Sequence, residues 1–245
     1  MAPRRPQAPP ATLVLFVRHG RTPTTGAVLP GRAKGLHLDD GGRAQAEAVA
    51  QRIAALGAAA PGGRRRDGAA RGGQHRRPPA PEGGPAARLG AVYASPLERA
   101  RETAAPIARL LRVPVTVERG LQECDFGEWT GAELKALAKL PEWRTVQRWP
   151  SGWRFPGGES FAEMQTRMVL TVGRLRAMHP GETVVAISHA DPIKAAVAHA
   201  VGTHLDLFQR IVISPCSVTA ILYGDAGPTV LAVNTTAALT ELQPS

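Results

Sequence analysis

Cysteine is scarce in this chain of 245 residues, which contains only Cys124 and Cys216. The two residues lie far apart in the sequence and fit neither a disulfide framework nor the paired spacing of a zinc site. Their scarcity excludes a small secreted fold stapled by disulfides. A reduced, cytoplasmic protein is the expectation that follows.

Long apolar runs are also missing. No stretch approaches the roughly 20 residues that a membrane-spanning helix requires. The N-terminus begins with basic residues, but the apolar run that follows is too short for the core of a signal peptide and precedes no small-residue cleavage site. We therefore expect a cytoplasmic protein that does not bind membranes.

Acidic residues are outnumbered, because 20 Asp and Glu face 30 Lys and Arg and give a formal net charge of +10. Such a balance suggests a nucleic-acid partner. Half of the excess lies between Pro61 and Arg88, where seven arginines accompany only Asp67 and Glu82. This segment lacks aromatic residues that would stack on bases and large apolar residues that would offset its ordering entropy. We expect residues 60–89 to form a disordered loop, and the alternative of a nucleic-acid-binding protein rests on this loop alone.

The rest of the sequence alternates short apolar runs with amphipathic helical patterns. Runs of strand length occupy residues 12–17, 91–94, 113–117, 183–187, 217–222 and 229–233. The pattern is typical of a three-layer α/β/α sandwich with a mostly parallel central sheet. We expect one catalytic domain over residues 12–235, flanked by a Pro-rich tail at 1–11 and a C-terminal tail at 236–245.

Helix boundaries can be predicted from capping residues. The first helix is expected from about Asp39 to Leu56, with Gly57 as its stop. Ser95 and Glu98 predict a capping box for a helix that ends near Leu111, and a second capping box is expected at Ser160 and Glu163. The last helix is expected over residues 192–201.

Three of the predicted strands end in residues suited to phosphate. These strand ends are Arg18-His19, Ser95–Arg99 and Ser188-His189. Since ligands bind beyond the carboxyl ends of parallel strands, the two arginines and two histidines should meet at one edge. Arginine forks fit phosphate oxygens, and a neutral imidazole can attack phosphorus. A metal site is less favoured, because the arginines would repel a cation and no acidic or cysteine cluster accompanies the histidines.

A proton donor for the leaving oxygen is expected in the stretch LQECDFGEW, residues 121–129. Glu123 is the candidate, whereas Asp125 and Glu128 are interpreted as surface-loop acids. A carboxyl group in a partly desolvated pocket stays protonated near neutral pH and then serves as a base toward water.

Five motifs resemble the histidine phosphatase superfamily in its phosphoglycerate mutase-like branch, in the family's order: VRHGRT, SPLERARET, LQECDFGEW, FPGGES and SHADPIK. The resemblance covers roughly residues 12–235 apart from the basic loop. It implies a phosphoglycerate mutase-like fold, with His19 as the phosphorylated nucleophile and Glu123 as the proton donor. It also implies that Arg18, Arg99 and His189 hold the phosphoryl oxygens, with no metal and no cofactor.

The chain departs from the family pattern at three positions. Arg21 and Thr25 stand where the first motif often has Glu and Asn, and Ala190 follows His189 where glycine is usual. Thr25 still offers a hydroxyl that can donate a hydrogen bond to phosphate. These departures bear on the substrate more than on the reaction.

The residues and the resemblance together favour a metal-independent phosphatase that hydrolyses a small phosphomonoester through a phosphohistidine. A phosphoglycerate mutase-type phosphomutase is the alternative, and the absence of adjacent basic residues within 130–155 disfavours it. The same region carries Trp129, Trp143, Trp149 and Trp153. These rings form either an aromatic lid over the substrate or the packing of a small helical cap. The expected partner is a small-molecule phosphomonoester, and a homodimer is left open.

Overall fold

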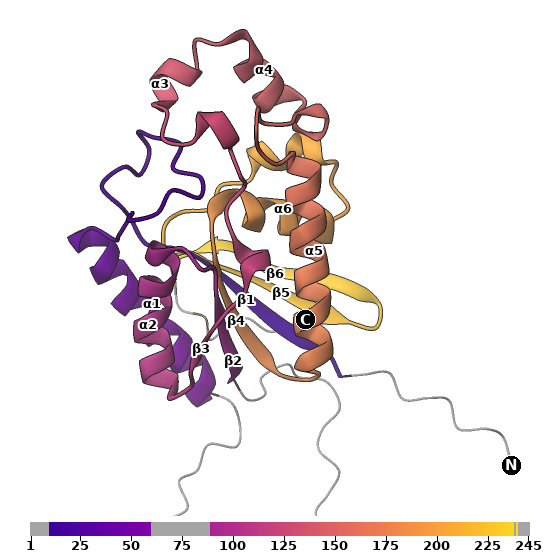
Figure 1. Cartoon of the computed structure of the whole chain (residues 1–245). Coiled ribbons are helices and arrows are strands. Elements are labelled where there is room, and N and C mark those ends of the chain that lie inside the picture. The colour runs from indigo at the N-terminus through magenta and orange to yellow at the C-terminus, as the bar shows by residue number, and fades with distance from the viewer. Residues whose placement is uncertain (1–9, 60–88, 238, 240–245) are drawn as a thin grey trace, which may run out of the picture.

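The computed structural model describes residues 10–59, 89–237 and 239 (Figure 1). The predicted basic loop lies outside the described residues except for Leu89, which begins a strand rather than ending the loop. Residues 1–9 and most of the predicted C-terminal tail lie outside them as well. Leu239, within that predicted tail, is 1% exposed and packs in the core cluster that includes residues of the first helix.

A six-stranded sheet forms the middle layer, in the order β3-β2-β4-β1-β5-β6. The strands are β1 (Thr12–Arg18), β2 (Leu89–Ala94), β3 (Val115–Val117), β4 (Thr183–Ser188), β5 (Val218–Gly224) and β6 (Gly227–Thr235). The first four strands in this order, β3, β2, β4 and β1, run parallel to one another. β5 pairs antiparallel with β1 on one side and with β6 on the other. Only two residues join β5 to β6, and a connection this short requires antiparallel strands. The predicted mostly parallel sheet is confirmed.

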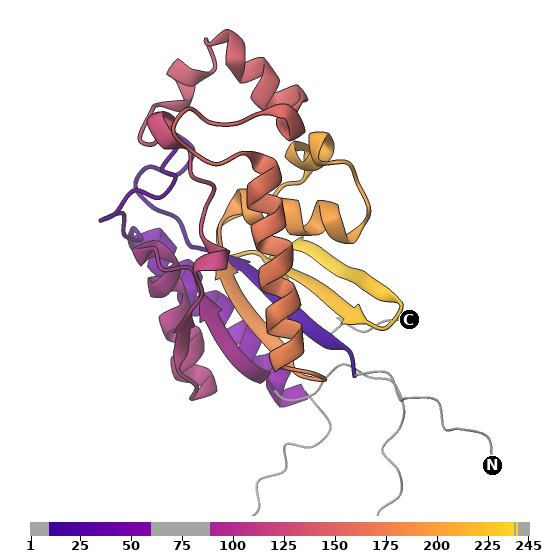
Figure 2. The same ribbon diagram turned by 45° about the vertical axis from the view of Figure 1, so that its right-hand side comes forward.

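Helices cover both faces of the sheet, as Figures 1 and 2 show. One face packs on α1 (Asp40–Ala59) and α2 (Glu98–Leu111), the other on α5 (Phe161–Met178) and α6 (Ala190–Ala200). Side chains alternate along β1, so Leu13 and Leu15 join the first core while Val14 and Phe16 join the second. The three-layer α/β/α sandwich is therefore confirmed.

A small cap lies above the carboxyl edge of the sheet (Figure 2). It contains α3 (Leu134–Leu137) and α4 (Pro141–Arg148), with short 3₁₀ helices at Gly127–Trp129, Pro150–Gly152 and Leu205–Arg210 nearby; another 3₁₀ helix, Arg119–Leu121, packs against α5 and β4. Trp129 stacks on Trp143 with ring centroids 6.2 Å apart and contacts Trp153 at 5.3 Å. Trp149 is 59% exposed. Three of the four rings thus pack the cap, which favours the cap interpretation over the lid.

Two helix predictions were wrong at their boundaries. The first helix continues through Gly57 to Ala59, because alanines are the strongest helix formers and carry it beyond the glycine. The helix after β2 begins at Glu98 with Leu97 as its N-cap, so no capping box forms at Ser95. Ser95 is instead engaged by a distant histidine, described below. The capping box of Ser160 and Glu163 is confirmed.

The described helices are all too short or too polar to cross a lipid bilayer. Cys124 and Cys216 are both buried and unpaired.

Candidate active site

The ends of β1, β2 and β4 meet at the carboxyl edge of the sheet. The backbone N–H of His19 donates to the carbonyl of Ser188 at 3.0 Å, and that of Ser95 donates to the carbonyl of Ile187 at 3.0 Å. These bonds extend the parallel pairing of the three strands by one residue each. They bring the arginine and histidine side chains of the three turns together, as expected from the sequence.

Gly20 fixes the turn that follows His19. A Cβ at this position would lie 2.6 Å from the backbone oxygen of Gly42, so a larger residue would push the turn away from α1. The Gly20 N–H donates to the hydroxyl of Thr103 at 3.0 Å, and that hydroxyl donates to the carbonyl of Arg99. The turn is therefore tied to α2, the helix that carries Arg99.

His19 is held as a neutral imidazole with its lone pair on Nε2. Its Nδ1 lies 2.7 Å from the carbonyl oxygen of Gly20, which only accepts, so Nδ1 carries the proton. Nε2 faces the Nε–H of Arg99 at 3.3 Å. Burial, with the charges of Arg99 and Arg18, holds the pKa of His19 well below its usual value. This is the protonation state that a nucleophilic histidine needs.

Arg18 and Arg99 are anchored by backbone carbonyls close to His19. Arg18 donates from Nη1 to Ile213 at 2.7 Å, and the fully buried Arg99 donates from Nη2 to Gly31 at 2.7 Å. Burial lowers the pKa of both guanidinium groups, and the carboxyl of Glu123 opposes that effect. Within the described residues, Arg18 Nε and Arg99 Nη1 are buried without a hydrogen-bond partner.

His189 lies beside His19, with ring centroids 5.0 Å apart. Its Nε2 is 2.8 Å from the hydroxyl of Ser95, which accepts the N–H of Leu97 at 3.4 Å. When the Ser95 hydroxyl donates to Nε2, the His189 proton lies on Nδ1. This Nδ1 is buried and finds no partner among the described residues. Burial, followed by the charge of Arg99, keeps the pKa of His189 well below its usual value, so the ring is neutral.

Glu123 is a buried carboxyl group that lines the same cavity as His19. It is 7% exposed, and its Oε1 accepts the N–H of Cys124 at 2.9 Å. Burial, together with the negative charge of Asp191, raises its pKa to about 7, although Arg99 and Arg18 oppose the shift. Both the protonated and the ionised forms are therefore present near neutral pH.

Two arginines that sequence reasoning missed hold the segment that carries Glu123. Arg32 donates to the carbonyl of Glu123 at 2.9 Å, and Arg167 donates to the carbonyl of Gly120 at 2.7 Å. Both also pair with Glu159, at 2.9 and 2.8 Å. Glu159 belongs to the FPGGES motif, which was the one signal in the sequence for this support.

A cavity of about 250 Å³ opens over His19. Arg18, Glu123 and Thr25 also line it, whereas Arg99 and His189 are buried beside His19 and are not among its lining residues. The Thr25 hydroxyl accepts the N–H of Thr22 at 2.9 Å, so it is positioned within the cavity wall. No tryptophan lines the cavity, which again disfavours an aromatic lid. Asp191 and Lys194, from the SHADPIK motif, line it without having been predicted as site residues.

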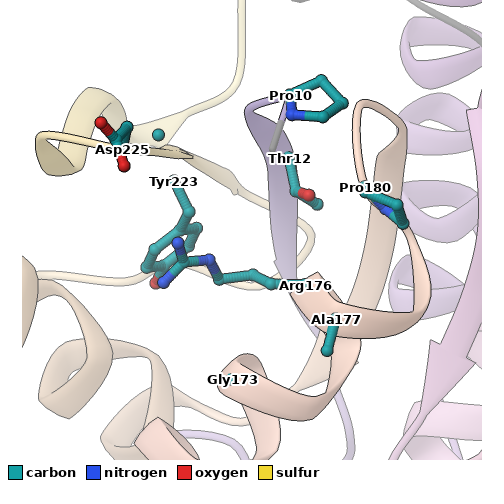
Figure 3. A pocket seen from close by; sticks show the side chains of 9 residues that line it. Pro10, Thr12, Gly173, Arg176, Ala177, Pro180, Tyr223 and Asp225 are labelled. Atoms are coloured by element: carbon teal, nitrogen blue, oxygen red, sulfur yellow. The ribbon is translucent and has the colours of Figure 1, made fainter. Parts of the chain in front are cut away.

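A larger cavity of about 490 Å³ lies at the opposite end of the sheet, beside the start of β1 (Figure 3). Arg176 lies over the ring of Tyr223, with its guanidinium carbon 5.0 Å from the ring centroid. Asp225 also lines this cavity. The described residues that line it include no histidine. The titratable groups suited to phosphoryl chemistry are thus at the smaller cavity.

Groups of three or more His, Cys, Asp or Glu side chains suited to a metal ion do not occur among residues 10–59, 89–237 and 239. The positive charges of Arg18 and Arg99 beside the histidine pair would also repel a cation.

Comparisons with known proteins find several chains that are similar in sequence. Phosphoserine phosphatase 1 of Hydrogenobacter thermophilus is 31% identical over 157 residues, which cover 62% of this chain and 74% of that protein. The bifunctional protein Rv2228c of Mycobacterium tuberculosis is 35% identical over 152 residues, 60% of this chain. The match covers only 41% of Rv2228c, so the chain spans about two fifths of that relative's length.

The fold has close counterparts among solved structures. A phosphoserine phosphatase mutant from Entamoeba histolytica in complex with phosphoserine superposes with a TM-score of 0.73 at 21% identity, covering 93% of this chain and 99% of that one. The sequence model of the histidine phosphatase superfamily (branch 1) matches residues 14–61 and 85–236. This match covers most of the chain, including the segments that carry all of the predicted site residues. The chain therefore belongs to the histidine phosphatase superfamily, in its phosphoglycerate mutase-like branch.

Proposed function

We propose that this protein is a metal-independent phosphatase that hydrolyses a small phosphomonoester through a phosphohistidine on His19. One observation carries the proposal: a neutral His19 with its lone pair on Nε2 is surrounded by buried nitrogen atoms that lack partners among the described residues. Phosphatases are among the proteins that resemble the chain, which supports the same reaction class.

The unpartnered atoms are Arg18 Nε, Arg99 Nη1 and His189 Nδ1. Leaving a buried donor unsatisfied costs about 1–3 kcal/mol, and more when the group is charged. A phosphoryl dianion offers acceptors to all three nitrogens and balances the two guanidinium charges. Because Arg99 Nε is within 3.3 Å of His19 Nε2, oxygens bound here would hold phosphorus in front of the nucleophile.

In the first step, His19 Nε2 attacks phosphorus, the N–P bond forms and the bond from phosphorus to the ester oxygen breaks. The protonated Glu123 gives its proton to that oxygen, and the alcohol leaves. The Nδ1–H of His19 stays on the carbonyl of Gly20, which stabilises the positive charge that the ring gains. A pKa of about 7 makes this proton available at neutral pH.

In the second step, water attacks the phosphohistidine, and the ionised Glu123 takes one of its protons. The N–P bond breaks, inorganic phosphate leaves and His19 returns to its neutral form. Arg18, Arg99 and His189 hold the transferring oxygens in both steps, so the positive charge that a metal ion supplies elsewhere comes from side chains.

The test is phosphate release from p-nitrophenyl phosphate by the wild type, His19→Ala and His199→Ala, each with EDTA. His199 is exposed on α6 and serves as the matched control. We expect the wild type and His199→Ala to stay active with EDTA and His19→Ala to lose activity. Loss of wild-type activity in EDTA, or retention by His19→Ala, would overturn the proposal. Phosphoryl transfer from a bisphosphate to a monophosphate without hydrolysis would favour the mutase alternative.

A further inference from the structure

The cavity over His19 contains one ion pair that the proposed phosphoryl chemistry does not use. Asp191 Oδ1 lies 3.2 Å from Lys194 Nζ on the first turns of α6, and both residues line the cavity. The side chains are only 17% and 16% exposed. Exposed pairs of this spacing are common and contribute little, whereas an enclosed pair carries a desolvation cost.

A second element fixes the position of this pair. Gln209, in the 3₁₀ turn Leu205–Arg210, accepts a hydrogen bond from Lys194 Nζ at 3.0 Å. Nζ also lies 5.8 Å from the centroid of the Phe208 ring. Lys194 is therefore held between α6 and this turn rather than extending into solvent.

Both members of the pair retain groups that a ligand can use. Among the described residues, the hydrogen bonds of Lys194 engage two of its three Nζ protons, and those of Asp191 engage one of its two oxygens. The third proton and the second oxygen remain for a molecule in the cavity. Such a molecule would meet one fixed positive and one fixed negative charge.

These charges are available to the part of the substrate that is not the phosphoryl group. Arg18 and Arg99 already balance the two negative charges of a phosphoryl group, so the Asp191–Lys194 pair is left for the rest of the substrate. Asp191 and Lys194 line the same cavity as Glu123, the group that protonates the leaving oxygen in the proposed reaction. A leaving group that carries only a carboxylate would be repelled by Asp191, and one that carries only an ammonium would be repelled by Lys194.

The apolar lining and the small volume of the cavity over His19 restrict the substrate further. Val28, Leu29, Pro30, Phe126 and Leu134 provide an apolar surface for a short carbon skeleton. A volume of about 250 Å³ is below the usual range of about 300–1,000 Å³ for ligand pockets, which indicates a small molecule.

Resting on the proposed function, we infer that the substrate is the O-phosphoester of a small hydroxy amino acid. Its carboxylate binds Lys194 and its ammonium binds Asp191. Four esters isolate the two charges: O-phosphoserine has both, phosphoethanolamine only the ammonium, 3-phosphooxypropionate only the carboxylate and ethyl phosphate neither. The measurement is kcat/KM for each ester with the wild type, Lys194→Met, Lys194→Arg, Asp191→Asn and the exposed control Lys135→Met.

In the wild type, O-phosphoserine is expected to exceed each ester with a single charge by about tenfold or more, as is usual for hydrogen bonds to charged groups. Lys194→Met should reduce the ratio of O-phosphoserine to phosphoethanolamine by a similar factor, while Lys194→Arg and Lys135→Met preserve it. Asp191→Asn should reduce the ratio of O-phosphoserine to 3-phosphooxypropionate. Ratios within one enzyme cancel any general effect of Asp191 on Glu123.

Equal kcat/KM for the four esters in the wild type, or ratios that Lys194→Met and Asp191→Asn leave unchanged, would overturn the inference. If p-nitrophenyl phosphate is still hydrolysed in a His19-dependent manner, the proposed function stands and only the amino acid specificity fails. If the wild type hydrolyses neither that ester nor the four test esters, the proposed function itself fails.

Discussion

Burial of Glu123 predicts a stability that depends on pH and can be measured without any substrate. Its pKa rises from 4.5 to about 7 on folding, mainly because the carboxyl is buried. Between these values the folded chain holds a proton that the unfolded chain has lost, so the free energy of unfolding falls as pH rises. Above pH 7 the folded chain has lost this proton as well, and the loss of stability caused by burying the charged carboxylate reaches its full value. The difference between the two pKa values corresponds to about 3 kcal/mol.

Glu123→Gln removes the ionisation but keeps an oxygen that can accept the N–H of Cys124. At pH 8 the variant is expected to be more stable than the wild type by about 3 kcal/mol, or roughly 6–12 °C in Tm for a chain of this size. At pH 5 this difference in the free energy of unfolding between the variant and the wild type should fall below about 1 kcal/mol, because Glu123 is then protonated in the folded wild type.

Urea unfolding followed by tryptophan fluorescence at the two pH values measures this gap. Glu128→Gln is the control, since that carboxyl lies in the same segment but is exposed, and its gap should be near zero at both pH values. A gap for Glu123→Gln that is the same at pH 5 and pH 8 would refute the argument from burial.

The other predictions concern activity. Arg99→Lys should lower kcat about a hundredfold, since lysine lacks the Nη1 and Nε donors around His19; unchanged turnover of p-nitrophenyl phosphate would contradict the assigned role. Ser95→Ala should reduce kcat by about tenfold, because it frees His189 to place its proton on Nε2, and full activity would argue against that tautomer. For an alkyl phosphate, kcat/KM should fall as pH rises through about 7 and Glu123 loses its proton; a pH profile that stays flat to pH 9 would exclude Glu123 as the acid.

Strand ends were predictable from the sequence because the signal there is local. A strand that is buried on both faces of the sheet, such as β1, appears in the sequence as a continuous apolar run. The polar residues that follow such a run are therefore easy to recognise. The alternation of strands and helices then places those ends on one edge without any knowledge of contacts. For this reason the sequence predicts that Arg18, His19, Arg99 and His189 lie close together, and in the structure Arg99 Nε and the His189 ring both lie beside His19.

Long-range partners were not predictable, because they leave no periodic trace. Ser95 matches a capping box locally, yet its hydroxyl contacts His189, 94 residues away. Arg32 reaches Glu159 across 127 residues, and neither position has a spacing that marks it. The Asp191–Lys194 pair has the helical i,i+3 spacing of an ordinary surface pair, and only its enclosure in the cavity distinguishes it.

Identification of the phosphorylated residue tests the account most directly. The wild type would be mixed with excess p-nitrophenyl phosphate, whose phenolate leaves without needing a proton from Glu123. The mixture would be quenched in alkali within milliseconds and its peptides analysed by mass spectrometry, with Glu123→Gln as a variant in which hydrolysis of the intermediate is slowed. We predict one phosphoryl group, bound to Nε2 of His19 and more abundant in the variant. Turnover with no covalent phosphate on the chain, or phosphate on any residue other than His19, would contradict the proposed mechanism.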